Sequence, residues 1–93
     1  MCGITGFLNL NSFNQETATP ILKEMTNLLT HRGPDSSGYW LRDQPMIALG
    51  HRRLSILDLS AAGHQPMASA CGRYILAYNG EIYNHLEIRK ILE

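Results

Sequence analysis

The Gly33–Pro34 pair in "HRGPD" ends a segment with helical periodicity, and the segments after it have the pattern of short strands. Before this pair, Thr19 is a candidate N-cap and Pro20 suits the first position of a helix. Apolar residues then recur on one helical face at Ile21, Leu22, Met25, Leu28 and Leu29. We therefore expect a helix of about three turns that starts at Pro20 and stops near Gly33, because proline disfavours the α conformation of the preceding residue.

Strand candidates lie on both sides of this helix. Residues 4–10 have the pattern of a strand with Gly6 inside it, and "GYWL", "MIALGHRRLSIL" and "RYILAY" follow the helix, separated by turn residues. A second helix is expected after Asn84, with Glu87 completing a capping box. Its expected core residues are Leu86, Ile88, Ile91 and Leu92. The order strand, helix, several strands, helix predicts the α+β class with largely antiparallel strands, because the connections between strands are short.

The composition excludes several classes of function. The 93 residues suffice for one small domain. The formal net charge is zero, so the sequence does not indicate the basic surface that would bind nucleic acid or an anionic membrane. No apolar run is long enough to span a bilayer, and no secretory signal is present. Cys2 and Cys71 do not make a disulfide framework, which favours a cytoplasmic protein with reduced thiols. The histidines are scattered without the spacing of a zinc site, so we expect no metal: His31, His51, His64 and His85.

Cys2 directly follows the initiator methionine. If Met1 is removed, which the small second side chain favours, Cys2 carries a thiol and a free α-amine. Such an amine has a reference pKa of about 7.7–8.0, so its neutral fraction can take the proton from the thiol. The alternative is that Met1 is retained and Cys2 is an ordinary strand residue, since most free cysteines are simply packed.

The segment "YNGEIYN" supplies candidate donors for an acyl-transfer site. The Asn79 side-chain amide and the Gly80 N–H could form an oxyanion hole, which such chemistry requires. Asn-Gly is also the commonest sequence of a tight hairpin turn. The two interpretations are compatible, because a turn at the end of a strand can point amides at a substrate.

Arg53 can bind a carboxylate through two parallel hydrogen bonds, and Glu81 can receive an ammonium group. Together with a thiol and oxyanion donors, these groups suit an α-amino acid with a side-chain amide, and glutamine fits. The alternative is that Arg53 and Glu81 pair with each other on the surface, where an ion pair contributes little. Arg52 points to the opposite side if the segment is extended, because strand side chains alternate.

Four segments, in this order, resemble the glutaminase domain of the asparagine synthetase family: "MCGI–GF", "HRGPDSSG", "GHRRLSILDLS–AGHQPM" and "YNGEIYNH". The members of this family are class II glutamine amidotransferases with the N-terminal-nucleophile (Ntn) hydrolase fold, a four-layer αββα sandwich. The resemblance runs from Cys2 to Leu92. It implies that the chain forms the N-terminal portion of such a sandwich.

The resemblance also implies a role for individual residues. Cys2 would be the nucleophile once Met1 is lost, and Asn79 and Gly80 would form the oxyanion hole. Residues that would bind glutamine are Arg53, Leu54, Ser55, Ile56, Leu57, Asn79, Gly80 and Glu81, with Arg53 on the α-carboxylate. A supporting role is expected for His31, Arg32 and Asp35 in the "HRGPD" loop.

The family pattern continues beyond residue 93 with later strands and an ATP-dependent synthetase domain. We expect residues 1–93 to be a truncated amidotransferase domain that hydrolyses glutamine poorly or not at all when alone. No cofactor is expected in this segment; ATP and Mg²⁺ would act in the synthetase domain, where aspartate or a related carboxylate accepts the ammonia. Glutamine and that domain are the expected partners, with homo-oligomer formation left open. A non-catalytic glutamine-binding or interaction module of the same fold remains the alternative function.

Overall fold

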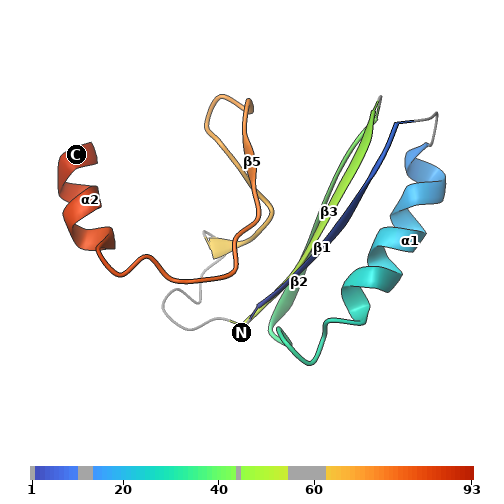
Figure 1. The fold of residues 1–93 in the computed structure, drawn as a ribbon, viewed down its shortest axis with the longest axis horizontal. Helices are drawn as coiled ribbons and strands as arrows, with labels where there is room; N and C mark the ends of the chain where they lie inside the picture. The colour runs from blue at the N-terminus through green and yellow to red at the C-terminus, as the bar shows by residue number, and fades with distance from the viewer. Residues whose placement is uncertain (1, 11–13, 44, 55–62) are drawn as a thin grey trace.

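The computed structural model describes residues 2–10, 14–43, 45–54 and 63–93. The elements are β1 (Gly3–Asn9), α1 (Gln15–Asn27), β2 (Ser36–Arg42), β3 (Met46–Arg53), β4 (Met67–Ala68), β5 (Ile75–Leu76) and α2 (His85–Leu92). Every strand pairing in this described part is antiparallel. The predicted α+β class with two helices is confirmed. Across Figure 1, α1, the larger sheet, the β4–β5 pair and α2 follow one another, as in the αββα order of the Ntn fold.

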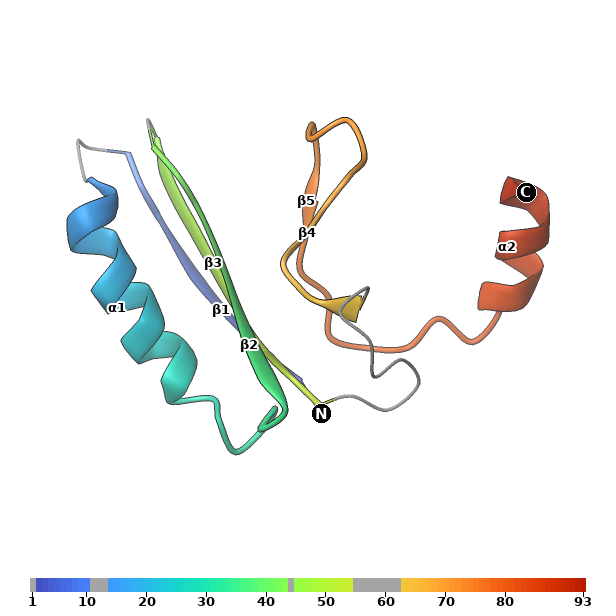
Figure 2. The same cartoon turned by 180° about the vertical axis from the view of Figure 1, so that it is seen from behind.

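The larger sheet has the strand order β1-β3-β2, and α1 covers one of its faces (Figure 2). Alternate residues of β3 point to that face and are buried against α1: Met46, Ala48 and Gly50. On the helix, Ala18, Leu22 and Thr26 recur every four residues and are fully buried. A methyl group at Gly50 would collide with the hydroxyl of Thr26, so the close approach of helix and strand requires glycine at this position.

The predicted start of the first helix is wrong. The helix begins at Gln15, and the side chain of Asn14 caps it by accepting a hydrogen bond from the N–H of Thr17 at 2.9 Å. Pro20 therefore lies inside the helix, where the ladder loses one backbone hydrogen bond. The helix ends at Asn27 and turns follow it as far as Arg32, so Leu28, one of the predicted apolar face, is 74% exposed.

The other face of the sheet carries the start of the chain. The register pairs Gly3 with Arg52 and Ile4 with His51, so Ile4 and His51 point away from α1. Continuing the alternation by one residue places Cys2 and Arg53 on this same face. We call it the open face, because it is only partly covered by the segment that contains β4 and β5: Ile4 is 41% exposed and Leu8 61%.

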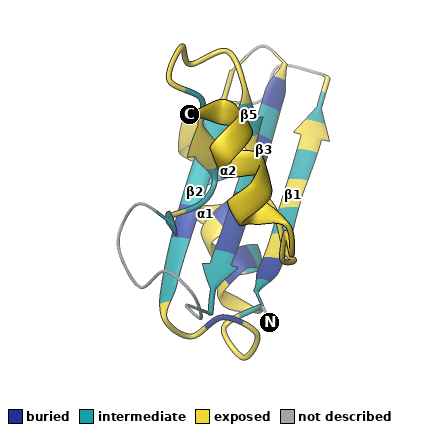
Figure 3. Cartoon of the chain, turned by 90° about the vertical axis from the view of Figure 1, so that its left-hand side faces the viewer, coloured by how far each residue is buried: buried dark blue, intermediate teal, exposed yellow. Residues whose placement is uncertain are grey.

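The C-terminal part of the chain forms less of the core than its sequence predicts. Helix α2 starts after Asn84 as expected, but the Asn84 side chain makes no capping hydrogen bond and no residue of the helix is buried (Figure 3). The predicted core residues of this helix are thus exposed: Leu86, Ile88, Ile91 and Leu92. Of "RYILAY", only β5 is paired, and its partner β4 has two residues. Among the described helices, neither has the length and apolar character needed to cross a membrane.

Candidate active site

Cys2 directly precedes β1 and is half-buried. The N–H of Leu54, just past the end of β3, donates to the Cys2 sulfur at 3.3 Å, and the carbonyl oxygen of Leu54 lies 3.7 Å from the same sulfur. The guanidinium Nε of Arg32 donates to the carbonyl oxygen of Cys2 at 3.2 Å. These contacts hold both the side chain and the backbone of Cys2 against segments far from it in sequence.

The two adjacent arginines of β3 point in opposite directions. The Nε of Arg52 donates to the carbonyl oxygen of Gly33 at 2.8 Å, on the side of α1. Arg53 lies on the open face with Cys2, and a methyl group at Gly63 would collide with its guanidinium. The guanidinium on the same face as the thiol is therefore that of Arg53, as the alternation of the strand predicts.

The "HRGPD" loop contacts both candidate residues. Besides the hydrogen bond from Arg32 to Cys2, the N–H of Asp35 donates to the carbonyl oxygen of Arg53 at 3.0 Å. A methyl group at Gly33 would collide with the backbone of Arg52. The loop thus packs on the backbone at the end of the sheet where Cys2 and Arg53 lie.

Asn79 and Gly80 lie between β5 and α2 and are exposed. No described strand pairs after Gly80, so this Asn-Gly pair does not connect two strands of a hairpin here. Tyr78, just before them, reaches the open face, since its carbonyl oxygen lies 3.4 Å from Nε2 of His51. Within the described part of the chain, no hydrogen bond donated by the Asn79 side-chain amide or the Gly80 N–H is found.

The other residues predicted to bind the substrate are Glu81 and Leu54 to Leu57. Glu81 is exposed, and its backbone carbonyl accepts a hydrogen bond from the Tyr78 hydroxyl at 3.4 Å. Leu54 contacts Cys2 through its backbone. Ser55, Ile56 and Leu57 lie outside the described residues.

His51 lies on the open face next to the Tyr78 carbonyl, although the sequence indicated it only as one of four scattered histidines. Its side chain is 1% exposed, and in the described structure its Nδ1 has no hydrogen-bond partner. Burial lowers the pKa of His51, and the nearby charges of His64 and Arg53 act in the same direction, against the opposing hydrogen bond to the Tyr78 carbonyl. His51 is therefore neutral near pH 7. The "GHRR" motif offered no signal of this burial, which depends on segments distant in sequence.

This lowered pKa predicts a pH-dependent stability. In the unfolded chain the pKa of His51 is about 6.5, and in the folded protein it is lower. On acidification the unfolded chain therefore binds a proton at a higher pH than the folded protein does. We expect the free energy of unfolding to fall as the pH drops through 6.5 and to level off once the pH is below the lowered pKa of the folded protein, in total by about 1.4 kcal/mol for each unit of pKa difference. Thermal unfolding of the wild type and of His51→Gln at each pH measures this contribution. Parallel stability curves for the two proteins would contradict the assignment.

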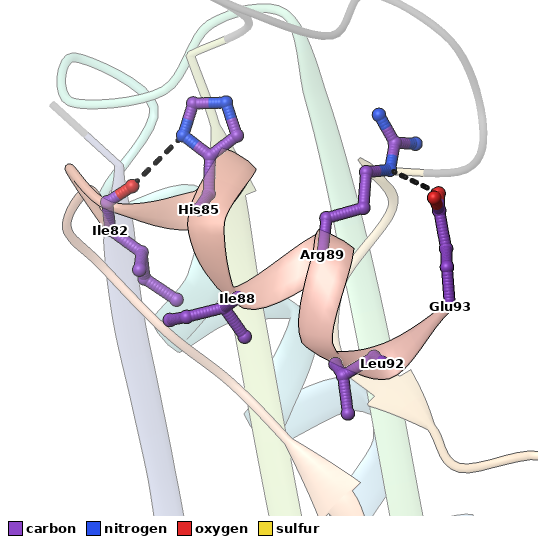
Figure 4. A pocket seen from close by; sticks show the side chains of 6 residues that line it. All are labelled: Ile82, His85, Ile88, Arg89, Leu92 and Glu93. Atoms are coloured by element: carbon purple, nitrogen blue, oxygen red, sulfur yellow. Dashed lines mark hydrogen bonds and ion pairs between the residues drawn. The ribbon is translucent and has the colours of Figure 1, made fainter.

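A groove along α2 lies elsewhere (Figure 4). It is lined by Ile82, His85, Ile88, Arg89, Leu92 and Glu93. The ion pair between Arg89 and Glu93, at 3.7 Å, flanks its apolar part. None of the candidate site residues lines this groove. The described residues also include no group of three or more His, Cys, Asp or Glu side chains that could hold a metal ion.

Comparison with known proteins identifies the class to which this α+β chain belongs. The family described as "Glutamine amidotransferase domain" matches the chain over residues 1–93. The chain belongs to this family.

Similar curated proteins include asparagine synthetases described as glutamine-hydrolysing. Asparagine synthetase 1 of Bacillus subtilis is 39% identical over the whole chain, which covers 14% of that protein. Asparagine synthetase B of Escherichia coli is 42% identical over 96% of the chain, or 15% of its own length. The amidase chry2 of Gibberella zeae is 37% identical over 91% of the chain and 14% of its length. The chain thus spans about a seventh of the length of these relatives.

Proposed function

We propose that this domain hydrolyses the side-chain amide of glutamine with Cys2 as the nucleophile, and that the ammonia serves an ATP-dependent amide-forming reaction of the asparagine synthetase type. The observation that carries the proposal is that Cys2 and Arg53 share one face at one end of the sheet, with the Leu54 N–H on the sulfur. Similarity to glutamine-hydrolysing asparagine synthetases supports the choice of glutamine.

The proposed reaction starts once Met1 is removed. The α-amine of Cys2 takes the thiol proton, and the sulfur attacks the side-chain carbonyl carbon of glutamine. The carbonyl oxygen becomes an oxyanion and accepts hydrogen bonds from the Asn79 amide and the Gly80 N–H. The carbon–nitrogen bond breaks, and the nitrogen takes the proton from the α-amine and leaves as ammonia. Water then cleaves the γ-glutamyl thioester, which gives glutamate and restores the thiol.

The proposed specificity for an α-amino acid rests on two charges. The Arg53 guanidinium binds the α-carboxylate in a two-pronged hydrogen bond, and the Glu81 carboxylate faces the ammonium group. The backbone of Leu54, which contacts the Cys2 sulfur, is proposed to line the same pocket.

Replacement of Arg53 by lysine tests this binding mode. We expect the KM for glutamine to rise by roughly 10–150-fold, because a hydrogen bond to a charged group is worth about 1.5–3 kcal/mol. Steady-state ammonia release by the complete gene product measures it. Arg52→Lys is the matched control, and its KM is expected within about threefold of the wild type, since that side chain faces α1. Equal effects of the two substitutions would contradict the clamp.

The remaining steps are proposed for a part of the protein outside these residues. ATP and Mg²⁺ would bind in a synthetase segment, where aspartate or a related carboxylate accepts the ammonia; the described residues offer no metal site of their own. Residues 1–93 alone are proposed to hydrolyse glutamine poorly, because α2 and much of the open face are uncovered. The other candidate, a glutamine-binding module without turnover, predicts that the complete gene product binds glutamine and releases no ammonia from it.

A further inference from the structure

We propose that His51 and Gln65 hold the backbone of Tyr78 on the two sides of its Cα atom and thereby aim the amide donors of Asn79 and Gly80. The inference rests on the proposed glutaminase function and assigns two positioning residues to it. Neither residue touches the substrate in this account. Each acts through the backbone of Tyr78, the residue immediately before the oxyanion donors.

The two peptide units that meet at the Cα of Tyr78 are each contacted by a side chain. Its N–H donates to the Gln65 side-chain oxygen Oε1 at 2.6 Å, and its carbonyl oxygen lies 3.4 Å from Nε2 of His51. A carbonyl oxygen is only an acceptor, so Nε2 must carry the proton and donate. Nδ1 then carries the lone pair of the neutral ring, in keeping with its lack of a partner among the described residues.

The two side chains are themselves fixed by the fold. His51 is in the central strand β3, 1% exposed, and pairs across the sheet with Gly38 of β2. A methyl group at Gly38 would collide with the carbonyl oxygen of Gln65 and lie 2.8 Å from Nε2 of His64. The segment with Gln65 therefore rests directly on the backbone of the sheet, which brings its side chain to Tyr78.

The side chain of Tyr78 also contacts the residues on the C-terminal side of Asn79. Its hydroxyl donates to the carbonyl oxygen of Glu81 at 3.4 Å and lies 2.7 Å from where a side chain at Gly80 would begin. Asn79 and Gly80 thus lie between the Tyr78–Asn79 peptide, which is contacted at its carbonyl oxygen, and the hydrogen-bonded carbonyl of Glu81. Because each peptide unit is planar, only the torsions at the intervening Cα atoms remain to be set.

The first test is independent of activity. With ¹⁵N-labelled histidine in the complete gene product, we expect the His51 resonances of a neutral ring protonated at Nε2 at about pH 7. These signals are assigned to His51 by their absence from the spectrum of the His51→Gln variant. A His51 ring protonated at Nδ1 alone would overturn the proposal, whether or not the protein hydrolyses glutamine.

The second test separates aiming from folding. In His51→Gln the side-chain amide nitrogen lies at about the position of Nε2 and can still donate to the Tyr78 carbonyl. In His51→Asn the amide nitrogen lies at the position of Nδ1, so this donor is lost. We expect His51→Asn to lower kcat for glutamine by about 10–100-fold with KM within about twofold, and His51→Gln to keep kcat within about threefold of the wild type. Gln65→Met, which lacks the acceptor, is expected to behave like His51→Asn.

Combining the two substitutions gives the decisive comparison. Because both act on the backbone of one residue, Tyr78, the double variant His51→Asn, Gln65→Met should lose less than the product of the single losses. Fully multiplicative losses, or a fall in kcat for His51→Gln as large as for His51→Asn, would overturn the clamp. If the wild type releases no ammonia from glutamine, the proposed function fails instead, and the ring tautomer still decides whether the clamp exists.

Discussion

Replacing Cys2 with alanine is expected to lower kcat for glutamine hydrolysis in the complete gene product by about 10⁴-fold or more. Without the sulfur no thioester forms, and the oxyanion donors and the Arg53 clamp can only bind the substrate. Ammonia and glutamate release measure the effect. The KM or the dissociation constant for glutamine should change far less than kcat, because the groups proposed to bind glutamine remain.

Cys71 provides the matched control for this prediction. It is exposed, and the hydroxyl of Ser69, 3.4 Å from its sulfur, lowers the pKa of the Cys71 thiol. A general alkylating reagent should therefore label Cys71 readily, so loss of activity after alkylation would not by itself identify the nucleophile. Cys71→Ser is expected to keep the wild-type kcat. If Cys2→Ala keeps the activity and Cys71→Ser removes it, the assignment of the nucleophile is wrong.

Replacing Asn79 with alanine is the second large effect that we expect. Loss of one oxyanion donor typically lowers the rate by about 10²–10³-fold, and we expect this fall in kcat with little change in KM. Asn79→Asp should be impaired as well, because an ionised carboxylate accepts hydrogen bonds and cannot donate to the oxyanion. Steady-state kinetics with saturating glutamine make the comparison.

Asn84 supplies the control, since it is an exposed asparagine in the same segment that makes no side-chain capping hydrogen bond. Asn84→Ala should keep kcat within about twofold, as surface substitutions away from specific contacts usually do. If Asn79→Ala is as active as Asn84→Ala, the Asn-Gly pair is a turn without a catalytic role.

The parts of the fold that depend on local periodicity could be predicted from the sequence. Strand alternation assigned Arg52 and Arg53 to opposite faces, and the hydrogen bond from Arg52 to Gly33 agrees with it. The start of α1 was missed because Pro20 looked like a first-turn residue, while the cap is supplied by Asn14, six positions earlier. A proline is tolerated there because packing of Ala18 and Leu22 on the sheet outweighs one missing hydrogen bond.

The parts that depend on distant contacts could not be predicted in the same way. The apolar pattern of α2 indicated a core helix, yet no described element buries it. His51 is buried because Tyr78 and the segment around Gln65 fold over β3, and neither neighbour is near it in sequence. Motif order and spacing thus located the candidate residues, while the contacts that position them required the three-dimensional structure.

The most direct test of the account is the intact mass of the complete gene product before and after reaction with an electrophilic glutamine analogue. The account predicts that Met1 is absent, that one analogue adds per chain, and that peptide mapping places it on the sulfur of an N-terminal Cys2. Retention of Met1 in active protein, or an adduct on Cys71 with Cys2 unmodified, would contradict it.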